Sequence, residues 1–451
     1  MRIHFIAIGG SAMHNLAIAL KQAGHRVTGS DDEIFEPSKG RLQDYGLLPE
    51  SFGWHPDFVT NELDVIILGM HARADNPELI RAQQIGVPVL SYPEFLAQHA
   101  KHKQRIVIGG SHGKTTITSM VMHVMKHLNL DFDYLVGSRI KHFDVMVRLT
   151  NEAPVMIFEG DEYLSSPIDL RPKFHWYKPH IALISGIAWD HMNVFPTFEN
   201  YLEQFEIFIQ GIEPGGLLIY DENDEHLVQL VRNNPALASI GYGVHPHVVK
   251  DGVTWLQTEE GLVAIGLFGR HNLQNLNGAR LICKHSGISD HDFYQAIGSF
   301  EGAANRLEKV FDDHHLVYFK DFAHAPSKVR ATLLAVRDQF PDRKLVACFE
   351  LHTYSSLNIN FLSEYLHALD PADLACVYFN LHALALKKLP MLNKQEVKEA
   401  FGRDDLVVFN QSEDVINWIR QVKDENKVIL MMSSGNFDGI NHLELVKSLK
   451  A

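Results

Sequence analysis

One segment of this sequence combines residue types that together bind phosphate groups. Residues 105–118 read RIVIGGSHGKTTIT, an apolar run followed by glycines, a lysine and three threonines. Backbone N–H groups of such a loop can surround phosphate oxygens, Lys114 supplies a mobile positive charge, and Thr115 offers a hydroxyl to Mg²⁺. The segment predicts an ATP site formed by Gly110, Ser111, His112, Gly113, Lys114, Thr115 and Thr116.

The spacing of this loop narrows the class of nucleotide-binding protein. Its Gly-x-x-Gly-Lys-Thr pattern is shorter than the usual phosphate-loop spacing, which disfavours an ordinary GTPase or transport ATPase. The alternative is a glycine turn between a strand and a helix, with an incidental lysine. The Gly-Lys-Thr-Thr run directly after β-type residues favours the phosphate site.

Acidic side chains and a histidine follow two further apolar runs. Residues 155–158 lead into Glu159-Gly160-Asp161-Glu162, and residues 181–185 precede His191. Because the carboxyl ends of parallel strands meet at the edge that carries the phosphate loop, we expect Glu159 and His191 to bind Mg²⁺. Taken alone, the acidic residues would form a solvated loop and the histidine would cap a helix. Their place in register with the phosphate loop favours the metal site.

A second nucleotide-like unit opens the chain. The pattern predicts a strand over Arg2–Ile8, a turn at Gly9-Gly10-Ser11, a helix over Ala12–Ala23 and a strand over Arg26–Gly29. Asp31 follows the second strand, where a ribose hydroxyl is usually held. The glycines do not follow G-x-G-x-x-G, so NAD is disfavoured and another nucleotide is allowed. A plain packing turn remains the alternative.

Composition limits the partners of this chain. Its 451 residues are 46% hydrophobic, enough for two to four domains. With 41 basic against 55 acidic residues the net charge is −14, which disfavours nucleic acid and anionic membranes. The three cysteines lie far apart without metal-like spacing and read as reduced core residues of a cytoplasmic protein. No stretch of the sequence is long and apolar enough to span a bilayer.

Strands and helices alternate along the rest of the chain. Residues 65–68 and 87–90 read as strands, with a helix between them that begins with Asn76 as its cap and Pro77 in its first turn. Residues 99–104 read as a polar linker. Short β-rich runs recur between helical patterns at 310–321, 344–350, 375–379, 406–409 and 428–432. We therefore predict an α/β protein that contains a second doubly wound unit near its C-terminus.

Seven motifs in chain order resemble those of the Mur ligases, which form ATP-dependent amide bonds in peptidoglycan precursors. They lie at residues 9–11, 110–116, 159–163, 190–192, 269–275, 321–324 and 433–437. The resemblance covers essentially the whole chain and implies three α/β domains. These are an N-terminal Rossmann-like domain for the UDP-sugar (1–99), a central P-loop ATPase-type domain (100–304) and a C-terminal Rossmann-like domain for the amino substrate (305–451).

The resemblance also implies roles for single residues. The implied UDP-sugar residues are Gly9, Gly10, Ser11, Ala12, Met13 and Asp31; those added to the ATP site are Asn272, Asn275, Arg306 and Asp321. The implied catalytic residues are Lys114, Glu159, His191, Arg306 and His324, and the magnesium ligands are Thr115, Glu159 and His191. The lysine that other members carbamylate for a second magnesium is absent. Glu206, fifteen residues after His191, could supply a carboxylate there, or could be a helix-face charge.

The implied reaction has two steps. The lactyl carboxylate of UDP-N-acetylmuramate attacks the γ-phosphate of ATP, and the amine of the acceptor then displaces phosphate from the acyl phosphate. Because the amine must be neutral to attack, His324 or His352 is a plausible base. Residues 139–149, 169–177 and 322–324 resemble members that add L-alanyl-γ-D-glutamyl-meso-diaminopimelate in peptidoglycan recycling. His352 and Tyr354 resemble alanine-adding members, so we expect the tripeptide as acceptor, with L-alanine as the alternative.

Two other classes fit part of the pattern. A nicotinamide-dependent oxidoreductase would explain two Rossmann-like units but leaves Gly113-Lys114-Thr115 without a role. A non-catalytic nucleotide sensor would keep the phosphate loop but has no need of Glu159, His191 and Arg306 together. The sequence does not determine the oligomeric state.

Overall fold

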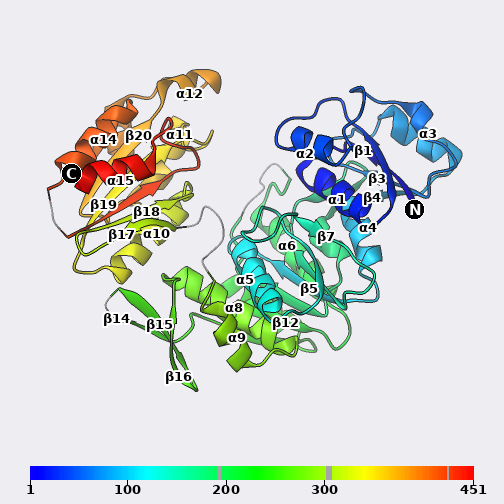
Figure 1. Cartoon of the computed structure of the whole chain (residues 1–451), viewed down its shortest axis with the longest axis horizontal. Coiled ribbons are helices and arrows are strands. Elements are labelled where there is room, and N and C mark those ends of the chain that lie inside the picture. The colour runs from blue at the N-terminus through cyan, green and yellow to red at the C-terminus, as the bar shows by residue number, and fades with distance from the viewer. Residues whose placement is uncertain (190–193, 251, 301–306, 424–425, 451) are drawn as a thin grey trace. The chain divides into compact units, whose positions relative to one another are not determined.

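The computed structural model describes residues 1–189, 194–250, 252–300, 307–423 and 426–450 (Figure 1). Two compact units make up the chain: Met1–His245 with Gln274–Ile297, and Pro246–Leu273 with Gly298–Ala451. Residues 246–273 thus group with the C-terminal part of the chain. The expected domain ranges 1–99, 100–304 and 305–451 remain predictions.

The first unit begins with a small parallel sheet in the order β2-β1-β3-β4. Its strands are β1 (Arg2–Ile6), β2 (Arg26–Ser30), β3 (Val65–Leu68) and β4 (Val89–Ser91). The helices around it are α1 (Ser11–Gln22), α2 (Ser38–Asp44), η1 (Pro56–Phe58), α3 (Pro77–Ile85) and α4 (Tyr92–His99). The expected start of α3 is confirmed, because Asn76 accepts the backbone N–H groups of Glu78 and Leu79 at 2.9 and 3.2 Å.

A seven-stranded sheet in the order β13-β12-β11-β5-β8-β6-β7 forms the rest of the first unit. Its strands are β5 (Gln104–Gly109), β6 (Phe132–Leu135), β7 (Val147–Arg148), β8 (Val155–Glu159), β11 (Ile181–Ile184), β12 (Leu217–Asp221) and β13 (Ala238–Tyr242). The helices are α5 (Lys114–His127), α6 (Phe198–Gln210), α7 (Glu225–Asn233), α9 (Asp290–Ile297) and, from Gln274 onward, α8 (Arg270–His285). Only β7 runs antiparallel to its neighbour among these described strands.

A short hairpin branches from this sheet after β8. It consists of β9 (Leu164–Ser166) and β10 (Asp169–Pro172) and continues into the short helix η2 (Lys173–Trp176). Phe174 of η2 is fully buried and stacks on Phe208 of α6 with ring centroids 4.5 Å apart. The hairpin is thereby fixed to the core of the unit.

The second unit contains a six-stranded sheet in the order β17-β18-β22-β19-β20-β21. The strands are β17 (Glu308–Asp312), β18 (Leu316–Asp321), β19 (Lys344–Leu351), β20 (Leu374–Phe379), β21 (Val407–Phe409) and β22 (Lys427–Met432). The helices are α10 (Pro326–Gln339), α11 (Ile359–Leu362), η3 (Ser363–Tyr365), α12 (Leu381–Leu386), α13 (Lys394–Phe401), α14 (Ser412–Gln421) and α15 (His442–Lys450). The expected doubly wound pattern is confirmed, since β18 to β21 pair in parallel with helices between them.

The expected run 310–321 is two strands rather than one. Asp313 accepts the backbone N–H groups of His315 and Leu316 at 2.9 and 2.8 Å, which turns the chain and pairs β17 antiparallel to β18. This side-chain turn has no glycine or proline to mark it in the sequence.

A separate three-stranded antiparallel sheet explains why residues 246–273 belong to the second unit. It consists of β14 (His247–Lys250), β15 (Val253–Thr258) and β16 (Gly261–Ile265). Gln339 of α10 donates to Gly252 O at 2.6 Å and accepts from Thr254 Oγ1 at 3.0 Å. The small sheet is thus bonded to a helix of the C-terminal sheet.

The described residues were also compared with two requirements, those of a membrane-spanning helix and those of a disulfide bond. No helix among them is long and apolar enough to cross a membrane. Cys283, Cys348 and Cys376 are all buried and free of disulfides.

A buried aspartate links the large sheet of the first unit to helix α4 and to the segment that follows it. Asp133 of β6 has a fully buried side chain that lies 2.9 Å from Lys103 Nζ and 3.2 Å from His99 Nε2, and it accepts two hydrogen bonds from Thr150. Burial on its own would raise the pKa of Asp133, but hydrogen bonds from His99, Thr150 and Lys103 outweigh it and leave the pKa below the usual aspartate value.

We expect Asp133→Asn to lower the free energy of unfolding at pH 7 by about 3–5 kcal/mol, because buried Lys103 loses its carboxylate partner. A carboxyl whose folded pKa is depressed stabilises the fold above its unfolded pKa, and this contribution is lost as the pH falls through the folded value. The difference between variant and wild type should therefore shrink below about pH 4. Urea unfolding across pH measures it. Asp57→Asn, at an exposed position, is the control, and equal effects of both substitutions would contradict the prediction.

Candidate nucleotide and magnesium site

The phosphate loop lies at the carboxyl end of the central strand β5, between β11 and β8. Gly110 and Gly113 have φ angles of +114° and +82°, a region that side-chain-bearing residues rarely adopt. A Cβ on Gly110 would lie 2.6 Å from Ser185 Oγ. Both glycines are thus required, and Gly113 caps the N-terminus of α5, whose free N–H groups suit an anion.

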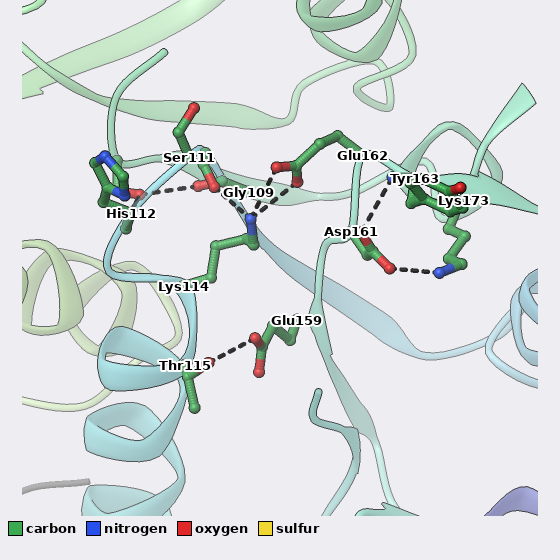
Figure 2. Close-up of polar contacts among 12 residues, drawn as sticks. Gly109, Ser111, His112, Lys114, Thr115, Glu159, Asp161, Glu162, Tyr163 and Lys173 are labelled. Carbon is green, nitrogen blue, oxygen red and sulfur yellow. Dashed lines mark hydrogen bonds and ion pairs between the residues drawn. The ribbon is translucent and has the colours of Figure 1, made fainter. Parts of the chain in front are cut away.

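Lys114 is held inside this loop by a buried carboxylate (Figure 2). Its Nζ donates to Gly110 O at 2.6 Å and to the two Glu162 oxygens at 3.1 and 2.9 Å. The Glu162 side chain is only 1% exposed and also accepts from Tyr201 OH of α6 at 3.2 Å. Glu162 is therefore part of the site, and the alternative that it belongs to a solvated loop is wrong.

Thr115 and Glu159 form the oxygen pair expected of a magnesium site (Figure 2). Thr115 Oγ1 donates to Glu159 Oε1 at 2.7 Å, and Gly137 N donates to Glu159 Oε2 at 2.9 Å. Mg²⁺ usually takes one or two protein oxygens and completes its octahedron with phosphate oxygens and water. The hydroxyl of Thr115 and the carboxylate of Glu159 thus fit Mg²⁺ brought by a nucleotide. Among the described residues, no group of three or more His, Cys, Asp or Glu side chains that could hold a metal ion is found.

Two other residues, His191 and Glu206, were expected to bind magnesium. His191 lies outside the described residues. Glu206 lies on α6, five residues after Tyr201, and helical geometry turns it about 140° away from the Tyr201 side chain that reaches the phosphate loop. This position does not support Glu206 as a ligand, and its role remains a prediction.

Of the two asparagines expected on the adenine side, Asn275 lies at the phosphate loop. A Cβ on Gly113 would stand 2.4 Å from Asn275 Oδ1, so the amide packs directly against the start of α5. Asn272 belongs to the second unit and donates to Phe268 O at 3.0 Å. Glycine is therefore required at position 113 for two reasons, its positive φ angle and the lack of space for a Cβ beside Asn275.

The glycine turn after β1 rests on Asp31. Gly9 N donates to Asp31 Oδ2 at 2.7 Å, and Asp31 is 3% exposed. Burial raises the pKa of Asp31 to about 6, with a further rise from the neighbouring Asp32. Asp31 was expected to hold a ribose, but in this structure its carboxylate orders the turn that contains Gly9, Gly10 and Ser11.

A cationic cluster beside this turn was missed by sequence reasoning. Arg41 of α2 donates to Asn15 Oδ1 at 2.7 Å and lies 3.3 Å from His14 Nε2, while His14 Nδ1 lies 2.9 Å from Gly10 O. Burial lowers the pKa of Arg41, and the positive charge of nearby Arg139 lowers it further. The cluster joins residues from α1, α2 and the segment after β6, so no local motif could signal it.

In the second unit, two of the expected amino-substrate residues follow parallel strands of one sheet. His324 follows β18 and His352 follows β19, with β22 between them, so both lie at the same edge of the sheet. Glu350 Oε1 lies 3.6 Å from His352 Nδ1, and Glu350 Oε2 accepts from Phe437 N at 2.8 Å. Tyr354 is 59% exposed.

Two expected ATP residues belong to this C-terminal part. Asp321 accepts from Leu307 N at 2.8 Å and from Thr332 Oγ1 at 2.7 Å, so both of its oxygens have protein partners. Arg306 lies outside the described residues.

We expect Gly113→Ala to weaken ATP binding at least about tenfold, equivalent to about 1.4 kcal/mol. The added methyl would strain the left-handed φ and displace Asn275. Gly215→Ala is the matched control, because Gly215 has φ +79° with no atom within 4 Å of its Cβ position. Calorimetric titration with ATP compares the two, and an equal loss in both variants would contradict the role of close packing.

Family models match almost the whole chain: Mur ligase family, catalytic domain, at residues 2–104; Mur ligase middle domain at 108–283; and Mur ligase, glutamate ligase domain, at 305–435. A UDP-N-acetylmuramate–L-alanine ligase of Arthrobacter sp. is 30% identical over 390 residues, which cover 83% of this chain and 80% of the relative.

Two solved structures share the fold. A murein peptide ligase of Psychrobacter arcticus has a TM-score of 0.62 and 23% identity, covering 100% of this chain and 98% of its own. The UDP-N-acetylmuramate–alanine ligase of Thermotoga maritima has a TM-score of 0.68 and 21% identity, with coverages of 100% and 97%. The expected three-domain α/β fold is confirmed. Together with the Arthrobacter relative, the three matched domains show that this chain belongs to the Mur ligases, the ATP-dependent amide ligases of peptidoglycan biosynthesis.

Proposed function

We propose that this protein joins the lactyl carboxylate of UDP-N-acetylmuramate to the amine of L-alanyl-γ-D-glutamyl-meso-diaminopimelate, using ATP and Mg²⁺. ATP-dependent chemistry is supported by one observation: Lys114 and the Thr115–Glu159 pair lie together at the phosphate loop that follows β5. The tripeptide is supported by residues 169–177, which resemble peptide-adding members and form the ordered β10 strand and η2 helix beside the site.

The second candidate is transfer to free L-alanine. It is favoured by the name of the Arthrobacter relative and by the Thermotoga structure, both alanine ligases. The ATP chemistry is the same in both cases. Only the acceptor distinguishes the two candidates.

In the first step, charge builds up on the phosphoryl group as the sugar carboxylate attacks it. Lys114 can move from Glu162 to a phosphate oxygen by rotation of its flexible stem, while the N–H groups at the start of α5 hold the phosphates. Thr115 and Glu159 would hold Mg²⁺, which neutralises charge between phosphate oxygens when bound. Each group acts by position and charge, so no covalent chemistry by the protein is needed.

The UDP-sugar would bind at the small parallel sheet. The turn at Gly9-Gly10-Ser11 presents backbone N–H groups, and the guanidinium groups of Arg41 and Arg139 add positive charge beside it. Backbone N–H groups and guanidinium groups are donors that suit the diphosphate of the UDP-sugar.

In the second step, the acceptor amine must lose a proton before it attacks. His324 and His352 follow two parallel strands of the second unit, β18 and β19, that are separated by β22, and an imidazole titrates in the range this step requires. The buried carboxylate of Glu350 lies 3.6 Å from His352 Nδ1 and would help to orient the imidazole ring.

The acceptor assay tests the proposal directly. With UDP-N-acetylmuramate and ATP, we expect the tripeptide to give a kcat/KM at least about tenfold above L-alanine, a difference of about 1.4 kcal/mol that a few hydrogen bonds to its carboxylates can supply. Phosphate release measured in parallel with L-alanine, dipeptide, tripeptide and tetrapeptide decides it. A higher kcat/KM for L-alanine would establish the second candidate instead. Phosphate release without an acceptor requirement would contradict both.

We expect Lys114→Ala to slow phosphate release by about 10²-fold or more, because a charge that neutralises the transferred phosphoryl group is lost. Binding of UDP-N-acetylmuramate should be unchanged, since the glycine turn belongs to a different sheet. Lys101→Ala, at an exposed position of the same unit, is the control. Residual activity above about a tenth of wild type would remove Lys114 from the mechanism.

A further inference from the structure

The segment that carries both acidic contacts to the phosphate loop has little regular structure of its own. We call residues 159–163 the acid loop. At its start, Glu159 accepts from Thr115, and near its end Glu162 accepts from Lys114. Gly160 between them has greater backbone freedom than other residues, so the conformation of the acid loop requires support from elsewhere.

Backbone hydrogen bonds from η2 provide part of this support. Lys173 N donates to Tyr163 O at 2.9 Å, and Phe174 N donates to Asp161 O at 3.2 Å. Phe174 is fully buried against Phe208 and thus anchors η2 to α6. The acid loop therefore lies against a fixed element.

A side-chain ion pair holds the middle of the acid loop (Figure 2). Lys173 Nζ donates to Asp161 Oδ2, and Asp161 Oδ1 accepts from Tyr163 N at 3.0 Å. The Lys173 side chain is 14% exposed, and its Nζ lies 5.6 Å from the ring centroids of both Tyr92 and Tyr163. The Asp161 side chain is 41% exposed, so shielding from water comes from the lysine side of the pair. A shielded ammonium interacts more strongly with its carboxylate than a solvated one does.

A second ion pair exists in the same hairpin for comparison. Arg171 donates to both oxygens of Asp169, at 2.8 and 3.1 Å, and the Arg171 side chain is 59% exposed. Solvent screens this guanidinium more than it screens the Lys173 ammonium. The two cations thus differ in burial and in what their carboxylates hold, since only Asp161 belongs to the acid loop.

We propose that Lys173 is a positioning residue: through Asp161 it fixes the acid loop so that Glu159 faces Thr115 and Glu162 faces Lys114. Lys173 touches neither the phosphate loop nor the oxygen pair itself, so its effect passes through Asp161. The consequence for Mg²⁺ and ATP rests on the proposed function, whereas the effect on the acid loop does not.

The first test measures the acid loop without any ligand. Hydrogen–deuterium exchange of a peptide covering residues 159–163 should be about tenfold faster in Lys173→Met than in wild type, and close to wild type in Lys173→Arg. Arg171→Met is the matched control and should leave the exchange unchanged. Unchanged exchange in Lys173→Met, or the same increase in Arg171→Met, would overturn the proposal.

The second test measures binding of a non-hydrolysable ATP analogue with Mg²⁺ and with EDTA. Lys173→Met should weaken binding about tenfold with Mg²⁺ but less than twofold with EDTA, because the oxygen pair is displaced while the glycines remain. Asp161→Asn should have the same effect, and the double variant should bind no worse than either single one. Equal loss in both solutions, or additive losses, would overturn the proposal. If Mg²⁺ did not strengthen binding of the analogue to the wild-type protein, the proposed function would be contradicted. The exchange experiment would still test whether Lys173 fixes the acid loop.

Discussion

The parallel register of β5 with β8 and β11 is the constraint on which the candidate site depends. Ile108 pairs with Glu159 and Gly109 pairs with Ile184, so three strands end within one residue step of each other. Whatever follows these strands must share the same edge. The phosphate loop follows β5 and the acid loop follows β8, and their meeting is therefore a property of strand alignment and not of either sequence motif alone.

Charge makes these two loops depend on each other. A carboxylate as buried as Glu162 is tolerated only with a cation and hydrogen bonds, which Lys114 and Tyr201 provide. Lys114 in turn is directed along the loop by Glu162. A phosphate that binds Lys114 thus competes with an anion that the protein already holds, and the net gain is the difference between two ion pairs. When Lys114 moves to a phosphate, the Glu162 carboxylate loses its cation but keeps the hydrogen bond from the Tyr201 hydroxyl, which limits the loss of stabilisation.

Sequence reasoning succeeded where a local rule determines structure. Strand β5 with its glycines, the start of α3 at Asn76 and the parallel strands of the second unit are all set by neighbouring residues. It missed features that arise from distant parts of the chain. The buried state of Glu162 depends on α6, and Arg41 meets Asn15 only because α2 packs on α1. A carboxylate in a polar sequence looks solvated until the fold supplies its partner.

Asp31 shows that a correctly predicted element does not by itself determine what its side chain contacts. The strand–turn–helix–strand pattern was found, with the acid after the second strand, yet the Asp31 carboxylate turns inward to the Gly9 amide. The identity of the acceptor is hard to predict from the sequence for the same reason, because it depends on side-chain contacts that local sequence does not determine. Phosphate chemistry needs groups whose positions follow from backbone geometry, so glycines and strand ends reveal them. Acceptor choice is a difference of affinities. Under the proposed function it would depend on side chains such as Tyr354, which is exposed and whose neighbours no local pattern specifies. A single chain can therefore resemble one acceptor class in residues 169–177 and another at His352, while its ATP chemistry remains the same.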